Sequence, residues 1–122
     1  MDIKEGMRVF YVKTEKKEIK EKEWLTIKSV KKNDEDWGVL YTIELSNGET
    51  LYVHMANITE HRAVSESVGT CYFLIEEGVN PIFQINNFFE KKKEELREQI
   101  NTIRRYVVDY SELQEIIRTT LL

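Results

Sequence analysis

Cysteine, proline and long apolar runs are scarce in this chain of 122 residues. Cys71 is the one cysteine, which excludes an internal disulfide and a zinc site made of several cysteines. No stretch of 18 uncharged apolar residues occurs, so the sequence offers no membrane-spanning helix. The first ten residues, MDIKEGMRVF, have neither the basic nor the apolar region of a secretory signal. These absences predict a cytoplasmic protein that does not enter the membrane.

Residues that carry catalytic chemistry are also few. The two histidines, His54 and His61, are seven residues apart and match no metal-ligand spacing. No P-loop, Gly-x-Ser-x-Gly or Gly-x-Gly-x-x-Gly motif occurs. The sequence therefore predicts a protein that is not an enzyme and that holds no metal and no cofactor.

The net charge of −4 is spread unevenly. Residues 1–32 carry ten basic and six acidic side chains, whereas residues 33–90 carry one basic and ten acidic side chains. A nucleic acid is bound by clustered cations, which the acidic middle lacks, so we expect no general binding to nucleic acid. The acidic middle is better suited to a basic partner.

The composition favours residues with AT-rich codons: 12 Lys, 12 Ile and 7 Asn stand against 2 Ala, 5 Gly and 1 Pro. Such a bias is typical of a low-GC bacterium. We take a low-GC bacterium, or a phage or mobile element living in one, as the expected source.

Apolar stretches separated by polar turns predict a β-rich first part. The mixed charges of residues 13–23 predict a hairpin arm or loop, and Gly69 indicates a bulge or a close backbone approach. Pro81 precedes a short apolar stretch that we predict as an edge strand. Trp24 and Trp37 are expected in the core. The predicted strands cover residues 7–12, 24–30, 39–45, 50–55, 62–75 and 82–85.

The segment SNGETLYVH, residues 46–54, fixes a register. A two-residue turn at Asn47-Gly48 would leave both faces of the hairpin mixed, whereas a three-residue loop pairs Ile43 with Leu51 and gives one apolar face. We choose the three-residue loop, with Gly48 in a left-handed conformation. Tyr52 and His54 then lie on the face that points away from the core, where a ligand can reach them.

Residues 6–60 resemble the small SH3-like and Tudor-like β-barrels. The resemblance rests on an early glycine before the first strand, on WLTI (24–27), on YTIELSNGE (41–49) and on the end near Asn57-Ile58. It implies a partner-binding barrel that recognises peptides, modified side chains or nucleic acid. The charged insertion at 13–23 and the helical C-terminal part depart from the family, so no site residue is carried over.

A helical period begins after residue 86. Asn87 and Glu90 fit a capping box at a helix N-terminus, and DYSE (109–112) offers a second cap that predicts a shorter closing helix. The apolar positions of the long helix form a heptad-like seam whose skipped position is Lys93. Its members are Phe89, Leu96, Ile100, Ile103, Val107 and Tyr110; those of the closing helix are Leu113, Ile116, Ile117 and Leu121.

The sequence therefore predicts an α+β fold, with an antiparallel β-sheet or small SH3-like barrel of five to six strands followed by a long and a short C-terminal α-helix. We expect one domain over residues 1–122, with a β-rich part at 1–85 and a helical hairpin at 86–122. The seam is expected to pack on the sheet and the closing helix in a monomer, or on a second copy. Because a short sheet covers little area, we favour a homo-oligomer through residues 88–108.

An anion site is the sharpest candidate in the sequence. Asn86, Asn87 and Phe88 lie at the predicted start of the long helix, where free N–H groups and the helix dipole favour an anion, although an ordinary cap explains them as well. Arg105, with its neighbour Arg104, lies about 27 Å further along the same helix. Antiparallel pairing of two such helices would bring these arginines to Asn87 and Phe88 of the second copy.

Three functions remain in view. The first is a binding protein that sequesters a small phosphorylated signalling ligand at an oligomer interface, as an anti-defence sponge. The second is an inhibitor or adaptor that contacts a host protein through the acidic surface of residues 33–90. The third is a Tudor-like accessory module for nucleic acid.

Overall fold

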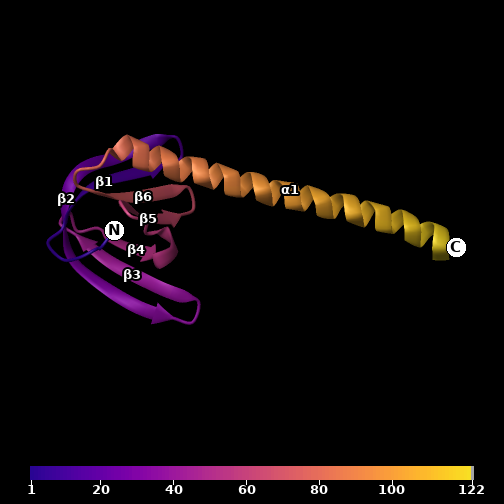
Figure 1. Cartoon of the computed structure of the whole chain (residues 1–122), viewed down its shortest axis with the longest axis horizontal. Coiled ribbons are helices and arrows are strands. Elements are labelled where there is room, and N and C mark those ends of the chain that lie inside the picture. The colour runs from indigo at the N-terminus through magenta and orange to yellow at the C-terminus, as the bar shows by residue number, and fades with distance from the viewer. Residues whose placement is uncertain (122) are drawn as a thin grey trace. The chain divides into compact units, whose positions relative to one another are not determined.

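The computed structural model describes residues 1–121 and consists of six strands, one short 3₁₀ turn and one long helix (Figure 1). Contacts divide the chain into two compact units, Met1–Ile85 and Asn86–Leu122. The strands are β1 (Arg8–Glu15), β2 (Glu18–Glu35), β3 (Gly38–Leu45), β4 (Thr50–His54), β5 (Arg62–Ser67) and β6 (Thr70–Glu76), with η1 (Met55–Asn57) after β4 and α1 (Pro81–Leu121) at the end.

The strands form one antiparallel sheet in the order β4-β3-β2-β1-β6-β5, which nearly closes into a barrel. β2 is 18 residues long and pairs with β1 in its first half and with β3 in its second. A register shift between Ile27 and Ser29 bends it between the two partners. The edge strands β4 and β5 are joined where the Ser65 hydroxyl donates a 2.8 Å hydrogen bond to the Tyr52 carbonyl oxygen. The predicted fold class, α+β with an antiparallel barrel-like sheet, is confirmed.

The barrel interior is the main core. Alternate residues of all six strands point inward, as a period of two requires. Ten side chains that are at most 8% exposed fill it: Val9, Tyr11, Leu25, Ile27, Ile43, Leu45, Leu51, Val53, Ala63 and Leu74.

β5 and β6 are buried on their outer face as well, where Val64, Phe73 and Ile75 have no exposed surface. Arg62, on this face, donates a 3.2 Å hydrogen bond from Nη1 to the carbonyl oxygen of Gln84. Gln84 is itself buried in the first turns of α1. The start of the helix is thereby tied to the outer face of the sheet.

The three-residue loop between β3 and β4 has the predicted geometry. Ile43 pairs with Leu51, and the Leu45 N–H donates to the Glu49 carbonyl oxygen at 2.9 Å. Gly48 has φ +88°, a conformation that glycine adopts without steric cost. The expected register is confirmed, and with it the outward direction of Tyr52, which is 59% exposed.

Residues 13–23 form the tip of the β1–β2 hairpin, which confirms the predicted hairpin arm. The predicted strands at 7–12 and 24–30 overlap β1 and β2. The segment 62–75 is different: it forms two strands joined by a tight turn at Val68-Gly69, rather than one bent strand. Gly69 has φ +75°, so the glycine makes a reversal and not a bulge.

The predicted edge strand 82–85 is wrong, because these residues form the first turns of α1. Asn80 caps the helix: its Oδ1 accepts hydrogen bonds from the N–H groups of Ile82 at 2.9 Å and Phe83 at 3.3 Å. Proline is favoured at the first helical position, where its missing N–H costs nothing. Pro81 therefore begins the helix instead of opening a strand.

The predicted break at residues 109–112 is also wrong, because α1 is one unbroken helix of 41 residues. Ser111, expected to cap a second helix, donates its hydroxyl to the Val107 carbonyl oxygen at 2.9 Å. This bond within the helix satisfies the side chain that would otherwise compete with the helix. The helical hairpin is accordingly a single helix.

Candidate functional site

An exposed group of aromatic and aliphatic side chains lies on the outer face of β3 and β4. We call it the aromatic face and define it as Trp37, Leu40, Tyr52 and His54. Leu40 pairs with His54 across the two strands, and the ring of Trp37, from the β2–β3 turn, packs at a tilt against the exposed His54 ring, with ring centroids 4.8 Å apart. Trp37 is 60% exposed. Large aromatic side chains grouped in this way on a surface are typical of a contact site.

The charges beside the aromatic face are mixed. Three acidic residues, Asp34, Glu35 and Asp36, immediately precede Trp37 in the chain. Lys31 pairs with Thr42 on the same side of the sheet as Tyr52. The carboxylates of residues 34–36 are the part of this neighbourhood whose charge is complementary to a basic group.

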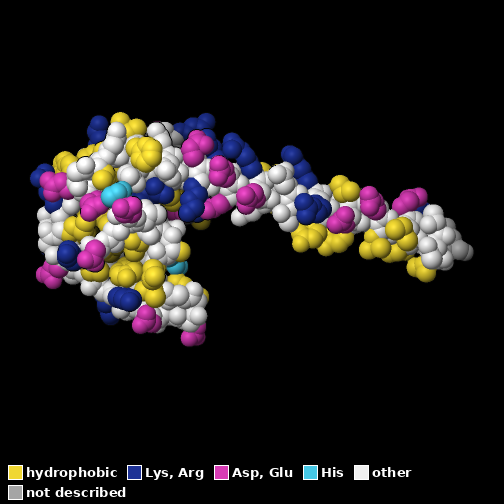
Figure 2. All heavy atoms as spheres, viewed as in Figure 1, with side chains coloured by type: hydrophobic (Ala, Val, Ile, Leu, Met, Phe, Trp, Pro, Cys, Tyr) yellow, Lys and Arg dark blue, Asp and Glu magenta, His cyan; other side chains and the backbone are white. Residues whose placement is uncertain are grey.

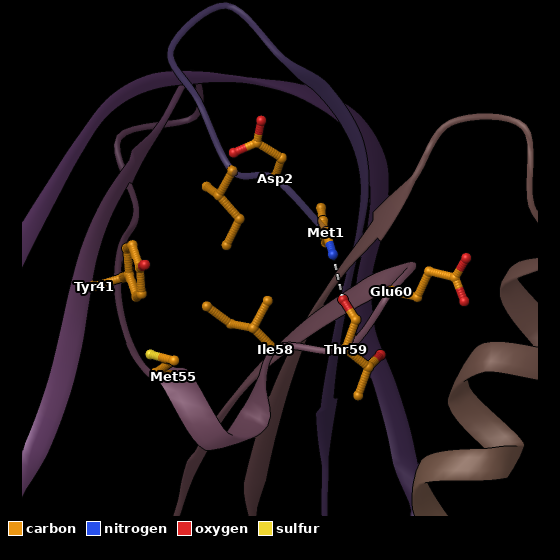
Figure 3. Close-up of a pocket in the computed structure, with 8 residues that line it drawn as sticks. Met1, Asp2, Tyr41, Met55, Ile58, Thr59 and Glu60 are labelled. Carbon is orange, nitrogen blue, oxygen red and sulfur yellow. Dashed lines mark hydrogen bonds between the residues drawn. The ribbon is translucent and has the colours of Figure 1, made fainter.

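A pocket of about 400 Å³ opens at one end of the barrel (Figure 3). Tyr41, Met55 and Ile58 are grouped along it, and the Met1 ammonium donates a 2.6 Å hydrogen bond to the Thr59 carbonyl oxygen beside it. Its walls also include Asp2, Ile3 and Glu60. The pocket brings together apolar walls and two carboxylates, without a nucleophile placed against a base.

The anion site was expected at a helix that begins near Asn87, but α1 begins at Pro81. Asn86 and Asn87 lie five and six residues inside α1, where backbone N–H groups are committed to the helix ladder. Phe88 is 5% exposed and lies 5.7 Å from the Phe89 ring, in an edge-to-face arrangement. The helix start is at Pro81 instead, and its first free N–H groups are bound by Asn80.

Arg104 and Arg105 are exposed on the same unbroken helix. Asn87 and Arg104 are 17 residues apart, or about 26 Å along the axis. A single chain therefore does not bring the predicted helix residues together. Tyr52 and His54, in contrast, are neighbours on one face of β4.

The seam of α1 is longer than the sequence predicted, because the helix continues past residue 110. Alternating steps of four and three residues now reach the end of the described helix. The seam is defined as Phe89, Lys93, Leu96, Ile100, Ile103, Val107, Tyr110, Gln114, Ile117 and Leu121. From Leu96 on, its apolar members are between 47% and 77% exposed. Figure 2 shows apolar side chains open to solvent along this part of the helix.

Two side chains border the seam. Tyr106 stacks on Tyr110 with ring centroids 6.3 Å apart, and Leu113 is 51% exposed beside Gln114. At the other end, the Lys93 ammonium contacts the Glu90 carboxylate at 2.6 Å and lowers the pKa of that carboxyl. The one basic side chain in the seam is thus held by an acid of its own chain.

The prediction that both tryptophans lie in the core is wrong, and Trp37 was therefore not predicted as a surface residue of a candidate site. Trp24 is 44% exposed, packs against Phe10 at 5.2 Å and has the Arg8 guanidinium 4.6 Å above its ring. The buried aromatic residue of this region is Tyr11. The polar stretch before Trp37, which predicts a turn, was the available signal that this side chain is not enclosed.

Within the described residues, no three His, Cys, Asp or Glu side chains gather as metal ligands would. Among residues 1–121, no helix is both long enough and apolar enough to cross a membrane. Comparisons with protein-family models, with curated proteins and with solved structures gave no match.

Proposed function

We propose that the protein is a non-catalytic binding protein that works as a homo-oligomer, in which α1 joins the copies and the barrel meets the partner. The exposed seam carries this proposal. A helix with an apolar stripe is stable in water when that stripe is covered, because isolated helices gain little from propensity alone. The second unit, Asn86–Leu122, contains most of α1 and no other described element that could cover it.

The magnitude of the burial supports association. Covering a Leu, Ile or Val side chain contributes about 1.5–3 kcal/mol, and seven apolar seam members after Phe89 are exposed. Because these side chains are 47–77% exposed before association, the gain is smaller than full burial would give, and summed over two copies it is comparable with the roughly 4–15 kcal/mol that bringing two chains together costs. Heptad spacing is the pattern that coiled-coil partners share.

For the barrel, we propose an adaptor or inhibitor that contacts a basic protein partner. The support is the acidic balance of residues 33–90 and the aromatic face that follows the acidic turn at 34–36. The nearly closed barrel is consistent with the resemblance to SH3-like and Tudor-like barrels, whose members bind partners. The excess of residues with AT-rich codons supports a proposed origin in a phage or mobile element of a low-GC host, and a proposed anti-defence role rests on that origin alone.

The phosphorylated-ligand version has less support. Its helix-end anion site requires a helix that begins near Asn87, and α1 begins at Pro81. Native mass spectrometry of the purified full chain addresses both questions. A homo-oligomer without added mass supports the present proposal, a bare monomer overturns it, and retained mass of a nucleotide returns the sponge to first place.

The partner class is tested by titration of the full chain carrying Trp24→Phe, so that Trp37 is the one reporter of fluorescence. The probes are a lysine- and arginine-rich peptide, an acidic peptide of the same length and a single-stranded oligonucleotide. We expect the basic peptide alone to change the emission, and the effect to weaken as salt rises. A response to the oligonucleotide alone would favour the nucleic-acid module, and no response to the basic peptide contradicts the acidic contact surface. The same titration with Trp37→Phe in place of Trp24→Phe is the control.

A further inference from the structure

We propose that two copies of the chain pair through the seam as an antiparallel, two-fold coiled coil in which Ile103 of one copy faces Val107 of the other. This inference rests on the self-association proposed above. It adds the direction and the register, which decide where the two barrels are held.

The register follows from the length of the seam. In an antiparallel pair, the two alternating classes of seam position face one another. With Ile103 opposite Val107, Ile100 lies opposite Tyr110, and Phe89 lies opposite Leu121. Every seam member then has a partner from one end to the other. Sliding the helices by one heptad either way leaves apolar members uncovered at the ends.

Charge argues against the parallel arrangement. In a parallel, in-register pair, Lys93 of one copy lies directly opposite Lys93 of the other inside the seam. Lys92 and Arg97 occupy the two heptad positions that flank the seam. In a parallel pair Lys92 of one copy therefore lies near Arg97 of the other, which adds a second contact between like charges at the border of the interface. None of the flanking pairs between residues 92 and 118 joins opposite charges in this direction.

The antiparallel arrangement removes these contacts. Lys93 faces Ile117 of the second copy, near the end of the seam, where its ammonium reaches the solvent and the Glu90 carboxylate of its own chain. Glu90 also comes level with Arg118 of the second copy, twice by symmetry. One like-charge contact remains, between the two Arg104 side chains at the exposed edge of the two-fold axis.

This register separates the predicted anion ligands instead of joining them. Arg104 lies about 28 Å along the axis from Asn87 of the second copy. Arg105 occupies the heptad position furthest from the seam, so it faces solvent. The composite anion site expected from the sequence is therefore incompatible with full coverage of the seam.

The functional consequence is bivalence. The two Asn86 residues, where each helix leaves its barrel unit, lie about 57 Å apart along the coiled coil. Two barrels are attached at opposite ends of a spacer, so that one dimer engages two copies of a partner, with an avidity that one barrel lacks.

Disulfide trapping tests the direction. Two full-length variants carry Cys71→Ser together with either Ile100→Cys or Tyr110→Cys. Each is oxidised alone, and both are oxidised after being unfolded and refolded as a mixture. The antiparallel register places the thiol at position 100 of one copy opposite the thiol at position 110 of the other, and puts identical positions about 15 Å apart, beyond disulfide reach. We expect a crosslinked dimer in the mixture and little in either variant alone.

The results separate two failures. Crosslinking of each variant alone, with a dimer by sedimentation, shows a parallel pair and overturns this inference while leaving self-association intact. A dimer or trimer that crosslinks under none of these conditions overturns the register. A monomer at all concentrations overturns the proposed function itself.

A charge reversal tests the antiparallel register a second time, in a chain that keeps Cys71. Glu90→Arg places one arginine against Arg118 of the second copy at each end of the pair, and we expect the dissociation constant to rise at least about fivefold. Adding Arg118→Glu restores the opposite charges, and we expect recovery to within about twofold of the original. In a parallel pair these residues do not meet, so a double variant as weak as the single one contradicts the antiparallel register. Arg105→Glu, on the solvent side, is the matched control.

Discussion

The barrel and the helix bury their apolar residues to very different extents. Val9, Ile27 and Leu74 of the barrel have no exposed surface, whereas Ile103 and Val107 of the helix are 61% and 59% exposed. The barrel completes its core within one chain, and the helix does not. The difference supports our proposal that a second molecule covers the helix, and the heptad spacing favours another helix as that molecule.

The largest effect should follow from a charge in the middle of the seam. Ile103→Asp buries an uncompensated carboxylate in both copies, and we expect the dissociation constant to rise at least about a thousandfold, or roughly 4 kcal/mol. Sedimentation velocity measures the change. Thr102→Asp introduces the same side chain one position away from the seam and should leave the association within about threefold. Equal effects of the two variants would remove the seam from the interface.

A cavity in the barrel core should lower the stability of the barrel and leave the association of the helices unchanged. Leu74→Ala truncates a fully buried side chain, and we expect a loss of about 2–5 kcal/mol in the free energy of unfolding, measured by urea denaturation with tryptophan fluorescence. Val68→Ala, at an exposed turn, should change it by less than about 0.5 kcal/mol. If Leu74→Ala dissociated the oligomer while it remained folded, the two regions would not be independent.

The helix cap should have an intermediate effect. Asn80→Ala removes the acceptor of the Ile82 and Phe83 N–H groups, which should cost about 1 kcal/mol of unfolding free energy. Asn80→Asp keeps the acceptor and should lose a few tenths at most. Thermal unfolding followed by circular dichroism compares the three proteins. Identical loss in both variants would show that the helix start depends on another contact.

The smallest effect concerns the buried Tyr11 hydroxyl, which makes no hydrogen bond of normal length and angle to the described residues, although the Glu21 carboxylate lies close enough to act on its pKa. Tyr11→Phe should leave the unfolding free energy unchanged or raise it by up to about 1 kcal/mol at neutral pH. Burial, followed by the Glu21 and Glu49 carboxylates, raises the pKa of this phenol above its usual 10.0. A loss of more than about 1 kcal/mol at neutral pH would show that the hydroxyl has a stabilising partner.

The same pKa shift predicts a dependence on alkaline pH. Because the folded state holds the Tyr11 proton more tightly than the unfolded state, its contribution is full below about pH 10 and declines as the pH rises above that value. The original protein should therefore lose more stability than Tyr11→Phe between about pH 10 and about pH 11.5. Parallel pH profiles of the two proteins would contradict the shift.

Sequence reasoning succeeded where one physical requirement dominated. The β3–β4 register was predictable because a single apolar face and a left-handed Gly48 agree on one loop length. The helix boundaries were less accessible. Asn80-Pro81 begins a helix here, and Ser111 bonds to the Val107 carbonyl oxygen instead of ending one.

The aromatic residues show a second limit. Tyr11 and Trp37 have similar apolar character, yet one is enclosed by the barrel and the other packs against His54 on its surface. Local pattern does not separate these cases, because burial depends on which strands close over a residue. The seam was visible in the sequence, but its full length required knowing that the helix continues through residues 109–112.

Hydrogen–deuterium exchange of the full chain and of Ile103→Asp tests the central claim most directly. We expect residues 96–121 to exchange much faster in the variant, because their helix loses its partner, and residues 8–76 to exchange at equal rates in both proteins. Equal exchange over 96–121 in the two proteins would show that the helix is stable without a second copy, and would contradict the account.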